Sequence, residues 1–185
     1  DNVLVQLQRL SSRQAELQTQ IATGQRVFQP GDDPAAVARI VSAQMERSSL
    51  LQYQRNTDAA LEYSKASYSS LEQMKSLSDR AGELSVLGAG ANGAQAMEAY
   101  ASEVNQLIEQ AVTVGQSRLR NDYIFSGTAV DSPPFNVTRD ADGQITGTTY
   151  TGDAGRLAVP IGPGAVINPT PDSATNAGMG DFINR

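Results

Sequence analysis

The distribution of proline restricts this chain more than any other feature of its sequence. The eight prolines stand at positions 30, 34, 133, 134, 160, 163, 169 and 171, so residues 35–132 contain none. Alanine, glutamine, glutamate, leucine and serine dominate this stretch, and most of these residues favour helix. Residues 128–185 hold six prolines and eight glycines, a composition typical of turns. The sequence therefore predicts a long helical part followed by a short, turn-rich part.

The first predicted helix covers about residues 2–23. Its apolar residues recur at spacings of 4, 3, 7 and 4, with Gln14 in the skipped position, which is a heptad-like pattern. Gly24 follows, at the place where many helices end in the left-handed conformation. We name these apolar residues the N-terminal stripe: Val3, Leu7, Leu10, Leu17 and Ile21.

A second helix is predicted over residues 34–87. Asp33 can cap it by accepting backbone N–H bonds, and Pro34 suits the first helical position, where a missing N–H costs nothing. At 1.5 Å per residue this helix makes a rod of about 80 Å, so an elongated molecule is expected. A glycine-rich segment at 88–93 interrupts the rod. Apolar residues in steps of three and four then predict a third helix over 94–125, antiparallel to the second.

The last third of the chain is predicted to be β. Two runs rich in β-branched and aromatic residues flank Asp-Ala-Asp-Gly at 140–143, which is a strong hairpin signal. From Pro169 onward the chain is predicted to be loop. The expected fold is mainly α with a small β domain (α+β), as an antiparallel long-helix bundle plus a short antiparallel β unit. The candidate strands are residues 135–139, 144–151, 156–161 and 165–168.

The residue types that are missing argue against several classes of function. The chain has no histidine, cysteine or tryptophan, so a Ser-His-Asp or Cys-His nucleophile, a disulfide and the usual zinc sites are excluded. A formal net charge of −6 argues against a general nucleic-acid binder, which needs a cationic surface. Without a run of about 18 apolar residues, membrane insertion is not expected. Any catalysis would have to use carboxylates, lysine, tyrosine or hydroxyl groups alone, and we expect no cofactor and no metal.

Three short motifs favour a structural interpretation over a chemical one. The GxGxxG pattern at 88–93 follows a helix and not a strand, so a hairpin turn explains it better than a dinucleotide site does. The adjacent carboxylates of Asp32 and Asp33 diverge in direction, which favours helix capping over acid–base chemistry or ion binding. The 140–143 segment lacks the glycine and glutamate spacing of a calcium loop and favours a turn.

The N-terminal stripe has no evident partner within the sequence. Helices of about 33 Å and 48 Å must line a rod of about 80 Å, which leaves each cross-section roughly two helices thick. A structure only two helices thick buries little apolar surface, so some of this surface should remain available for another chain. We expect the stripe to associate with another molecule, by self-pairing of first helices.

At several places the sequence resembles the flagellin superfamily. Thr23-Gly-Gln-Arg-Val27 and Pro30-Gly-Asp-Asp-Pro-Ala35 are similar to the turn and the Asp-Asp stretch that lead into the first rod-domain helix of that family. The segments Asn121-Asp-Tyr-Ile-Phe-Ser-Gly127 and Tyr150-Thr-Gly-Asp-Ala-Gly155 are more similar to hook–filament junction proteins than to filament flagellins. The residues that carry the junction-type motif are Asn121, Tyr123, Phe125 and Gly127.

The resemblance implies a structural protein without catalysis, with a helical inner layer and an outer β domain. Members of the family are exported unfolded through the flagellar channel, which implies an extracellular place in the bacterial flagellum. The implied function is to join the hook region to the flagellin filament by helical subunit packing. The implied partners are neighbouring copies of the chain, the adjacent hook-associated protein and flagellin. An export chaperone is implied only for the family's C-terminal helices, and the chain is expected to be a fragment that ends before them.

The resemblance also gives a role to the loop between the first two helices. It implies an assembly joint between an inner tube and a rod domain, across which Arg26 and Asp32 are expected to pair. The expected organisation is an inner helix and joint loop at 1–33, a helical rod domain at 34–130 and a small β-rich outer domain at 131–185. The residues of this assembly joint are Thr23, Gly24, Arg26, Val27, Pro30, Asp32, Asp33 and Pro34.

Two other classes of protein stay open at this point. One is a filament flagellin proper, which would end its helical part with Asn-Gly instead of the Tyr-Ile-Phe-Ser-Gly found here. The other is a coiled-coil tip or adaptor protein of a secretion system. A heptad-bearing helix in sequence beyond Arg185 would favour the flagellin superfamily over the second alternative.

Overall fold

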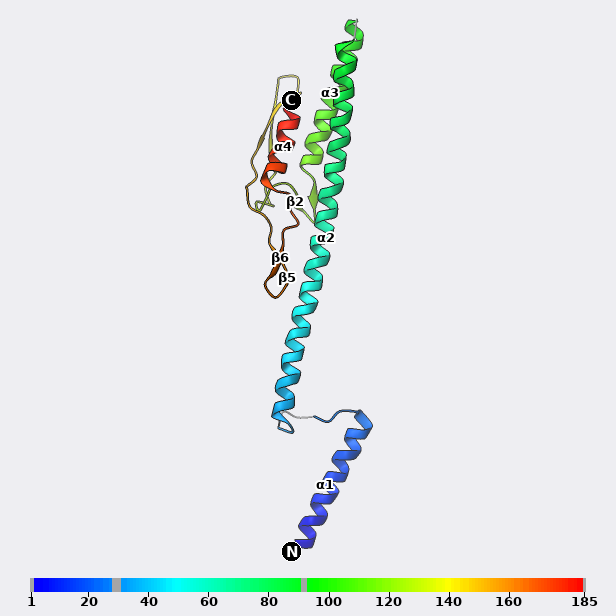
Figure 1. Ribbon diagram of the computed structural model, residues 1–185, viewed down its shortest axis with the longest axis vertical. Helices are drawn as coiled ribbons and strands as arrows, with labels where there is room; N and C mark the ends of the chain where they lie inside the picture. Colours follow the sequence, from blue (N-terminus) through cyan, green and yellow to red (C-terminus); the bar gives the residue numbers. More distant parts are fainter. Residues whose placement is uncertain (1, 28–30, 91–92, 185) are drawn as a thin grey trace. The chain divides into compact units, whose positions relative to one another are not determined.

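The computed structural model describes residues 2–27, 31–90 and 93–184 (Figure 1). Contacts within the chain define two compact units, Asp1–Leu51 and Gln52–Arg185, which we call the first and second units. Long helices accompanied by small antiparallel strand pairs confirm the predicted fold class. The elements in chain order are α1 (Asn2–Thr23), α2 (Pro34–Ala89), α3 (Ala94–Gly115), β1 (Arg118–Leu119), β2 (Asp122–Tyr123), β3 (Phe135–Arg139), β4 (Ile145–Tyr150), β5 (Val159–Gly162), β6 (Ala165–Ile167) and α4 (Ser173–Ile183).

The first unit contains α1 and the beginning of α2. Helix α1 ends where predicted, because Gly24 adopts a φ of 67° and its N–H donates to the Gln20 carbonyl at 2.8 Å. None of the residues of α1 is buried. Among the described residues of the first unit only Ala36, in the first turn of α2, is buried. This unit therefore has helical structure with almost no core of its own.

Helix α2 confirms the prediction of one long helix. It runs over 56 residues without a break, from the predicted Pro34 to Ala89, two residues beyond the expected end. Its start is capped by Asp33, whose Oδ1 accepts a hydrogen bond from the Ala36 N–H at 2.9 Å.

In the second unit, α3 returns antiparallel alongside α2, as expected (Figure 1). The prediction that this helix continues to residue 125 is wrong, because α3 ends at Gly115. A short β1–β2 hairpin follows, and Arg120 and Asn121 take positive φ values of 52° and 82° in its turn. This turn redirects the chain so that Phe125 enters the core, where it is 0% exposed.

The predicted hairpin around 140–143 is confirmed by the pairing of β3 with β4. The strands are antiparallel, with Phe135 opposite Tyr150 and a register shift after Thr138. Asp140 closes the turn, since its Oδ1 accepts from the backbone N–H groups of Asp142 and Gln144 at 3.0 and 2.9 Å. The two further strands are shorter than predicted and pair with each other as β5 and β6.

The prediction of a loop after Pro169 is wrong, since Ser173–Ile183 form helix α4. Asp172 caps it by accepting from the Thr175 N–H at 2.7 Å. Glycine is a poor helix former, and α4 contains two, so propensity alone argues against this helix. Tertiary contacts override propensity here. Its buried face consists of Asn176, Met179, Gly180 and Ile183.

The second unit has one hydrophobic core, to which α2, α3, β3 and α4 all contribute. At its centre the Tyr63 hydroxyl donates to the Ile124 carbonyl at 2.9 Å, and burial raises the pKa of Tyr63 to about 12. Strands β3 and β4 therefore share their core with the helices instead of building a separate one. The buried members are Tyr63, Met74, Ala111, Val112, Ile124, Phe125, Phe135, Met179 and Ile183.

Candidate functional site

The Asp33 carboxylate makes two contacts at the start of α2. While Oδ1 of Asp33 caps α2 through Ala36, its Oδ2 pairs with Arg26 Nη2 at 2.8 Å. The Ala36 N–H and the Arg26 guanidinium both favour the charged carboxylate and lower the pKa of Asp33. A single side chain therefore caps the start of α2 and connects it to Arg26, which follows α1.

The other joint residues take more local roles. Arg26 forms an ion pair with Asp33, whose carboxylate is oriented by its cap contact, and the expected pairing of Arg26 with Asp32 stays a prediction. The Thr23 hydroxyl donates to the Thr19 carbonyl at 2.7 Å in the last turn of α1. Val27 is half-buried and Pro34 is exposed as the first residue of α2. Pro30 lies outside the described residues.

The N-terminal stripe is fully formed on α1 and entirely exposed. Its exposed fractions run from 50% at Leu17 to 83% at Ile21. A second group of exposed apolar side chains follows in the part of α2 that belongs to the first unit. This group is Ile40, Val41, Met45, Leu50 and Leu51. The first unit therefore presents apolar surface that its own residues do not cover, which is the signature of an interaction surface.

The junction-type motif at 121–127 is mostly core and not surface. Tyr123 and Phe125 are 7% and 0% exposed, and the Arg118 guanidinium stacks 4.0 Å from the centre of the Tyr123 ring. Asn121 is exposed in the β1–β2 turn at positive φ, a conformation that asparagine tolerates. Gly127 is buried at a φ of 74°.

The two motifs that resemble junction proteins bind each other. The Tyr150 hydroxyl lies 3.1 Å from the Phe125 carbonyl, and the Asp153 N–H donates to the Ser126 carbonyl at 3.1 Å. The Asp153 carboxylate accepts from the Thr128 N–H at 2.7 Å. The sequence displayed these segments as separate motifs, 23 residues apart. The structure brings them together as one contact, which we call the motif pair (residues 125–128 and 150–155).

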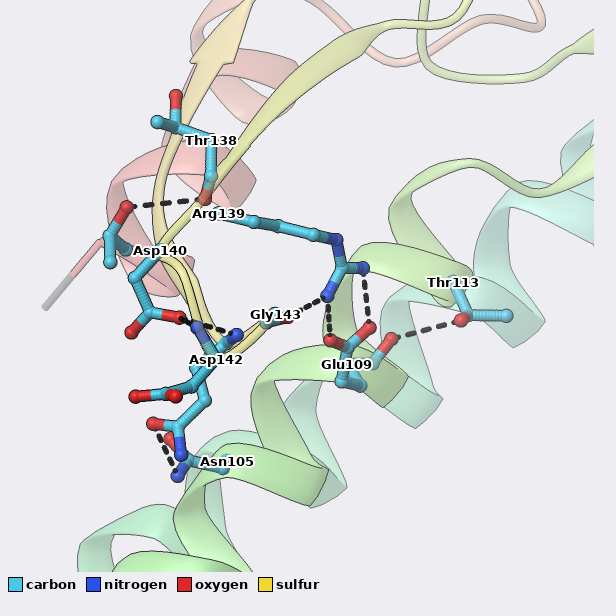
Figure 2. Close-up of polar contacts among 10 residues, drawn as sticks. Asn105, Glu109, Thr113, Thr138, Arg139, Asp140, Asp142 and Gly143 are labelled. Carbon is cyan, nitrogen blue, oxygen red and sulfur yellow. Dashed lines mark hydrogen bonds and ion pairs between the residues drawn. The ribbon is translucent and has the colours of Figure 1, made fainter.

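A second connection ties the β3–β4 hairpin to α3, and Figure 2 shows it. The Arg139 guanidinium makes a two-point contact with the Glu109 carboxylate, one arm of which is Nη2–Oε2 at 2.9 Å. Arg139 also donates to the Gly143 carbonyl at 2.7 Å, and the pKa of Glu109 is lowered by this guanidinium. Asn105 adds a hydrogen bond to Gln144 at 3.1 Å. Sequence reasoning missed this connection because partners 30 residues apart leave no local pattern.

Within the described residues, no group of three or more acidic side chains is placed to hold a metal ion. Over the same residues, the helices lack the combination of length and hydropathy needed to cross a membrane. An apolar groove of about 410 Å³ lies between α2, α3 and the end of α4, lined among others by Gly82, Leu107 and Phe182. The exposed apolar side chains of α1 and early α2 are the described features best suited to binding a partner.

The chain belongs to the flagellin family, since residues 2–129 match the family of the bacterial flagellin N-terminal helical region. Among solved structures, the fold is similar to a Vibrio parahaemolyticus structure described as a flagellar hook-associated protein. The TM-score is 0.57 at 18% sequence identity, over 84% of this chain and 74% of that one.

Two structures from Legionella pneumophila are also similar. The flagellar junction protein FlgL gives a TM-score of 0.54 at 18% identity, over 76% of this chain and 41% of that one. The flagellar hook-associated protein-3 gives 0.52 at 16% identity, over 74% of this chain and 40% of that one. The chain therefore spans about two fifths of the length of these two proteins. No curated protein sequence matches it.

Proposed function

We propose that this protein is a structural component of the bacterial flagellum that joins the hook region to the flagellin filament through helical subunit packing. The observation that carries the proposal is the combination of a flagellin-family match over residues 2–129 with a fold shared by structures described as hook-associated or junction proteins. The Tyr-Ile-Phe-Ser-Gly segment, where a filament flagellin would have Asn-Gly, supports a junction-type subunit, and in this chain the segment is buried against residues 150–155.

On this proposal the chain has no catalytic role and acts outside the cell after export through the flagellar channel. Its partners are neighbouring copies, the adjacent hook-associated protein and flagellin. The N-terminal stripe and the exposed apolar residues of early α2 serve as packing surfaces. Residues 1–33 form the inner helix and joint, 34–130 the rod domain, and 131–185 the outer domain.

Deletion of the gene in the source organism tests the proposal. If the protein joins hook and filament, cells without it keep their hooks but bear no filaments, because exported flagellin has nothing to build on. Flagellin should then accumulate in the medium, where an immunoblot detects it, while electron microscopy shows bare hooks. Restoring the gene should restore filaments and swimming.

The same experiment separates the alternatives. Loss of a filament flagellin would leave bare hooks without flagellin in the medium, so that result would overturn the junction proposal. Cells with normal filaments and normal swimming would argue for a secretion-system tip or adaptor. A double substitution of Leu7 and Leu10 by glutamate, expressed in the deletion strain, asks whether the N-terminal stripe is needed; bare hooks with normal export of the variant are expected.

A further inference from the structure

The Asp153 carboxylate is held by three hydrogen bonds within the second unit. It accepts from the Thr128 N–H at 2.7 Å, from the Gly155 N–H at 2.9 Å and from the Thr128 hydroxyl. All three donors are neutral groups, so the strength of the contact depends on the negative charge of the acceptor. Because two of the donors belong to Thr128, the carboxylate links the loop after β4 to the segment that follows β2.

The two segments around this carboxylate lie too close together to accommodate a side chain at Gly127 or Gly155. A Cβ on Gly127 would lie 2.1 Å from Asp153 Oδ1 and 2.5 Å from the Asp153 carbonyl oxygen. A Cβ on Gly155 would lie 2.7 Å from Thr128 Cγ2. Both glycines therefore allow the two segments to approach closely, and the close approach is what brings the donors to the carboxylate.

The position of the contact exposes it to competition from water. Ser126 and Phe125 beside it are 0% exposed, whereas Thr128 is exposed and Asp153 is half-buried. The core side of the motif pair is therefore buried, and its outer edge is exposed to solvent. A contact at a wet edge opens more readily than the core behind it, because water replaces each broken hydrogen bond.

Among the described residues, Tyr150 is the titratable group from a neighbouring element that contacts this loop. Tyr150 on β4 has its hydroxyl 3.1 Å from the Asp153 carbonyl oxygen, and Asn176 on α4 faces that hydroxyl at 3.5 Å. The segment at 133–134 contributes carbonyl groups, which accept from Thr151. The nearest basic residue along the chain, Arg156, donates to the Thr170 carbonyl at 3.4 Å and favours the charged form of Asp172.

We propose that Asp153 is a charge-dependent latch that keeps the loop at 150–157 closed over residues 125–128. With the carboxylate ionised, the loop is held on the segment that follows β2. When the charge is removed, the loop opens as a local unit, while the packed core of α2, α3 and α4 remains. The latch thus gives the second unit a segment that opens before the rest.

The direction of the pH dependence follows from the same contacts. The Thr128 and Gly155 donors hold the pKa of Asp153 below its ordinary value of 3.8. The stabilisation is therefore complete above the ordinary value and disappears as the pH falls through the lowered one. The loop should stay closed at neutral pH and open below about pH 4.

Hydrogen exchange followed by mass spectrometry on the whole chain tests the latch. Asp153→Asn keeps the shape and removes the charge, and we expect protection of the amides at 150–157 and at Thr128 to fall by about tenfold at pH 7. Thr128→Val, which removes the hydroxyl donor only, should lower it less. The matched control is Asp131→Asn, an exposed aspartate of the same unit, which should change nothing. Protection factors corrected for intrinsic rates should also fall below pH 4 in the wild type and stay flat in Asp153→Asn.

The protection of the helix amides distinguishes a local latch from a general loss of stability. Unchanged protection in α2 beyond residue 60 and in α3, with a local loss at 150–157, supports the latch. An equal loss throughout the second unit overturns it, because the carboxylate would then stabilise the whole fold. No change in Asp153→Asn also overturns it. An equal loss of protection at 150–157 in Asp131→Asn would also overturn the latch, because removing any acidic charge in this unit would then be enough to open the loop.

Discussion

The apolar faces of the helices are exposed in the first unit of this chain and covered in the second. In the first unit, 12 large apolar side chains are exposed and only Ala36 is buried among the described residues. In the second unit, the apolar faces of α2 and α3 close over a core that includes Phe125 and Phe135. Charge differs as well. The first unit carries five basic and five acidic residues, and the second nine basic and 15 acidic, so the whole net charge of −6 lies in the second.

The comparison shows that an amphipathic pattern identifies the apolar face of a helix but not the segment that will pack against that face. Both units satisfy the periodicity of a buried helix face, yet only the second contains additional segments, from β1 to α4, that fold against that face. A unit of zero net charge with exposed apolar surface is suited to packing against other copies of itself, because no repulsion between net charges opposes the association. An acidic unit with its own core is suited to facing water.

Removing a core ring from the second unit should have the largest effect on stability. Phe135 is 2% exposed, and its ring lies against Gly115, Gly180 and the Tyr150 ring. Phe135→Ala should lower the free energy of unfolding by about 3–5 kcal/mol, from lost transfer energy and the cavity left behind. Denaturant melts followed by circular dichroism measure this change.

Leu17→Ala is the matched control, because Leu17 is 50% exposed in the first unit. It should leave the melt of the second unit within about 0.5 kcal/mol of the wild type. If the two substitutions had similar effects, the contrast between a unit with a core and one without would be wrong.

Changing the N-terminal stripe should alter association and not stability. Five apolar side chains of this size, if buried against another molecule, would each contribute about 1.5–3 kcal/mol before the cost of association. The double substitution Leu7→Glu and Leu10→Glu should therefore shift the chain towards monomer in light scattering at high concentration. Its second unit should melt as before.

Ser11→Glu and Ser12→Glu together provide the control for added charge on α1 outside the stripe. This variant should associate like the wild type if the apolar face is what matters. A wild-type chain that is already monomeric at high concentration would show that the stripe does not pair with itself.

A smaller loss of stability is expected from adding a methyl group at Gly127. This glycine has a φ of 74°, and a Cβ there would lie 2.1 Å from Asp153 Oδ1. Gly143→Ala is the matched comparison, because Gly143 has a φ of 82° but open space around it. Each should lose roughly 1–2 kcal/mol for the left-handed backbone, and Gly127→Ala should lose clearly more because the motif pair must separate. Equal losses in denaturant melts would contradict the tight fit of the motif pair.

The sequence predicted the elements whose signals are local. The cap at Asp33, the helix end at Gly24 and the turn at 140–143 each depend on chemistry within a few residues, and the structure has all three. The ion pair of Arg139 with Glu109 and the docking of residues 150–155 on 125–128 connect segments far apart in the chain. No local pattern reports such contacts.

Helix α4 and the early end of α3 show how tertiary packing overrides propensity. In α4, Gly180 is a poor helix former, but its lack of a side chain lets the Phe135 ring pack against the helix; a Cβ there would lie 3.1 Å from Cε1 of that ring. The spacing of Asn176, Met179 and Ile183 after the Asp172 cap was present in the sequence, but two glycines obscured it. The third helix was predicted to reach Phe125, but α3 ends at Gly115, and the residues that follow form the β1–β2 hairpin and a turn that brings Phe125 into the core.

The smallest expected effect lies at the joint and concerns the first unit alone. The Ala36 N–H and the Arg26 guanidinium hold the pKa of Asp33 below its ordinary value of 3.8. The cap is therefore complete above that value and is lost as the pH falls through the lowered one. Protection factors corrected for intrinsic exchange rates should fall at amides 36–38 of α2 below about pH 4, whereas those near Leu71 should not change. Asp33→Asn, which keeps a capping oxygen but removes the charge, should make the protection factors at 36–38 independent of pH. Arg26→Gln should leave the cap in place and raise the pH at which it is lost. If Arg26→Gln abolished protection at neutral pH, the ion pair and not the cap would define the start of α2.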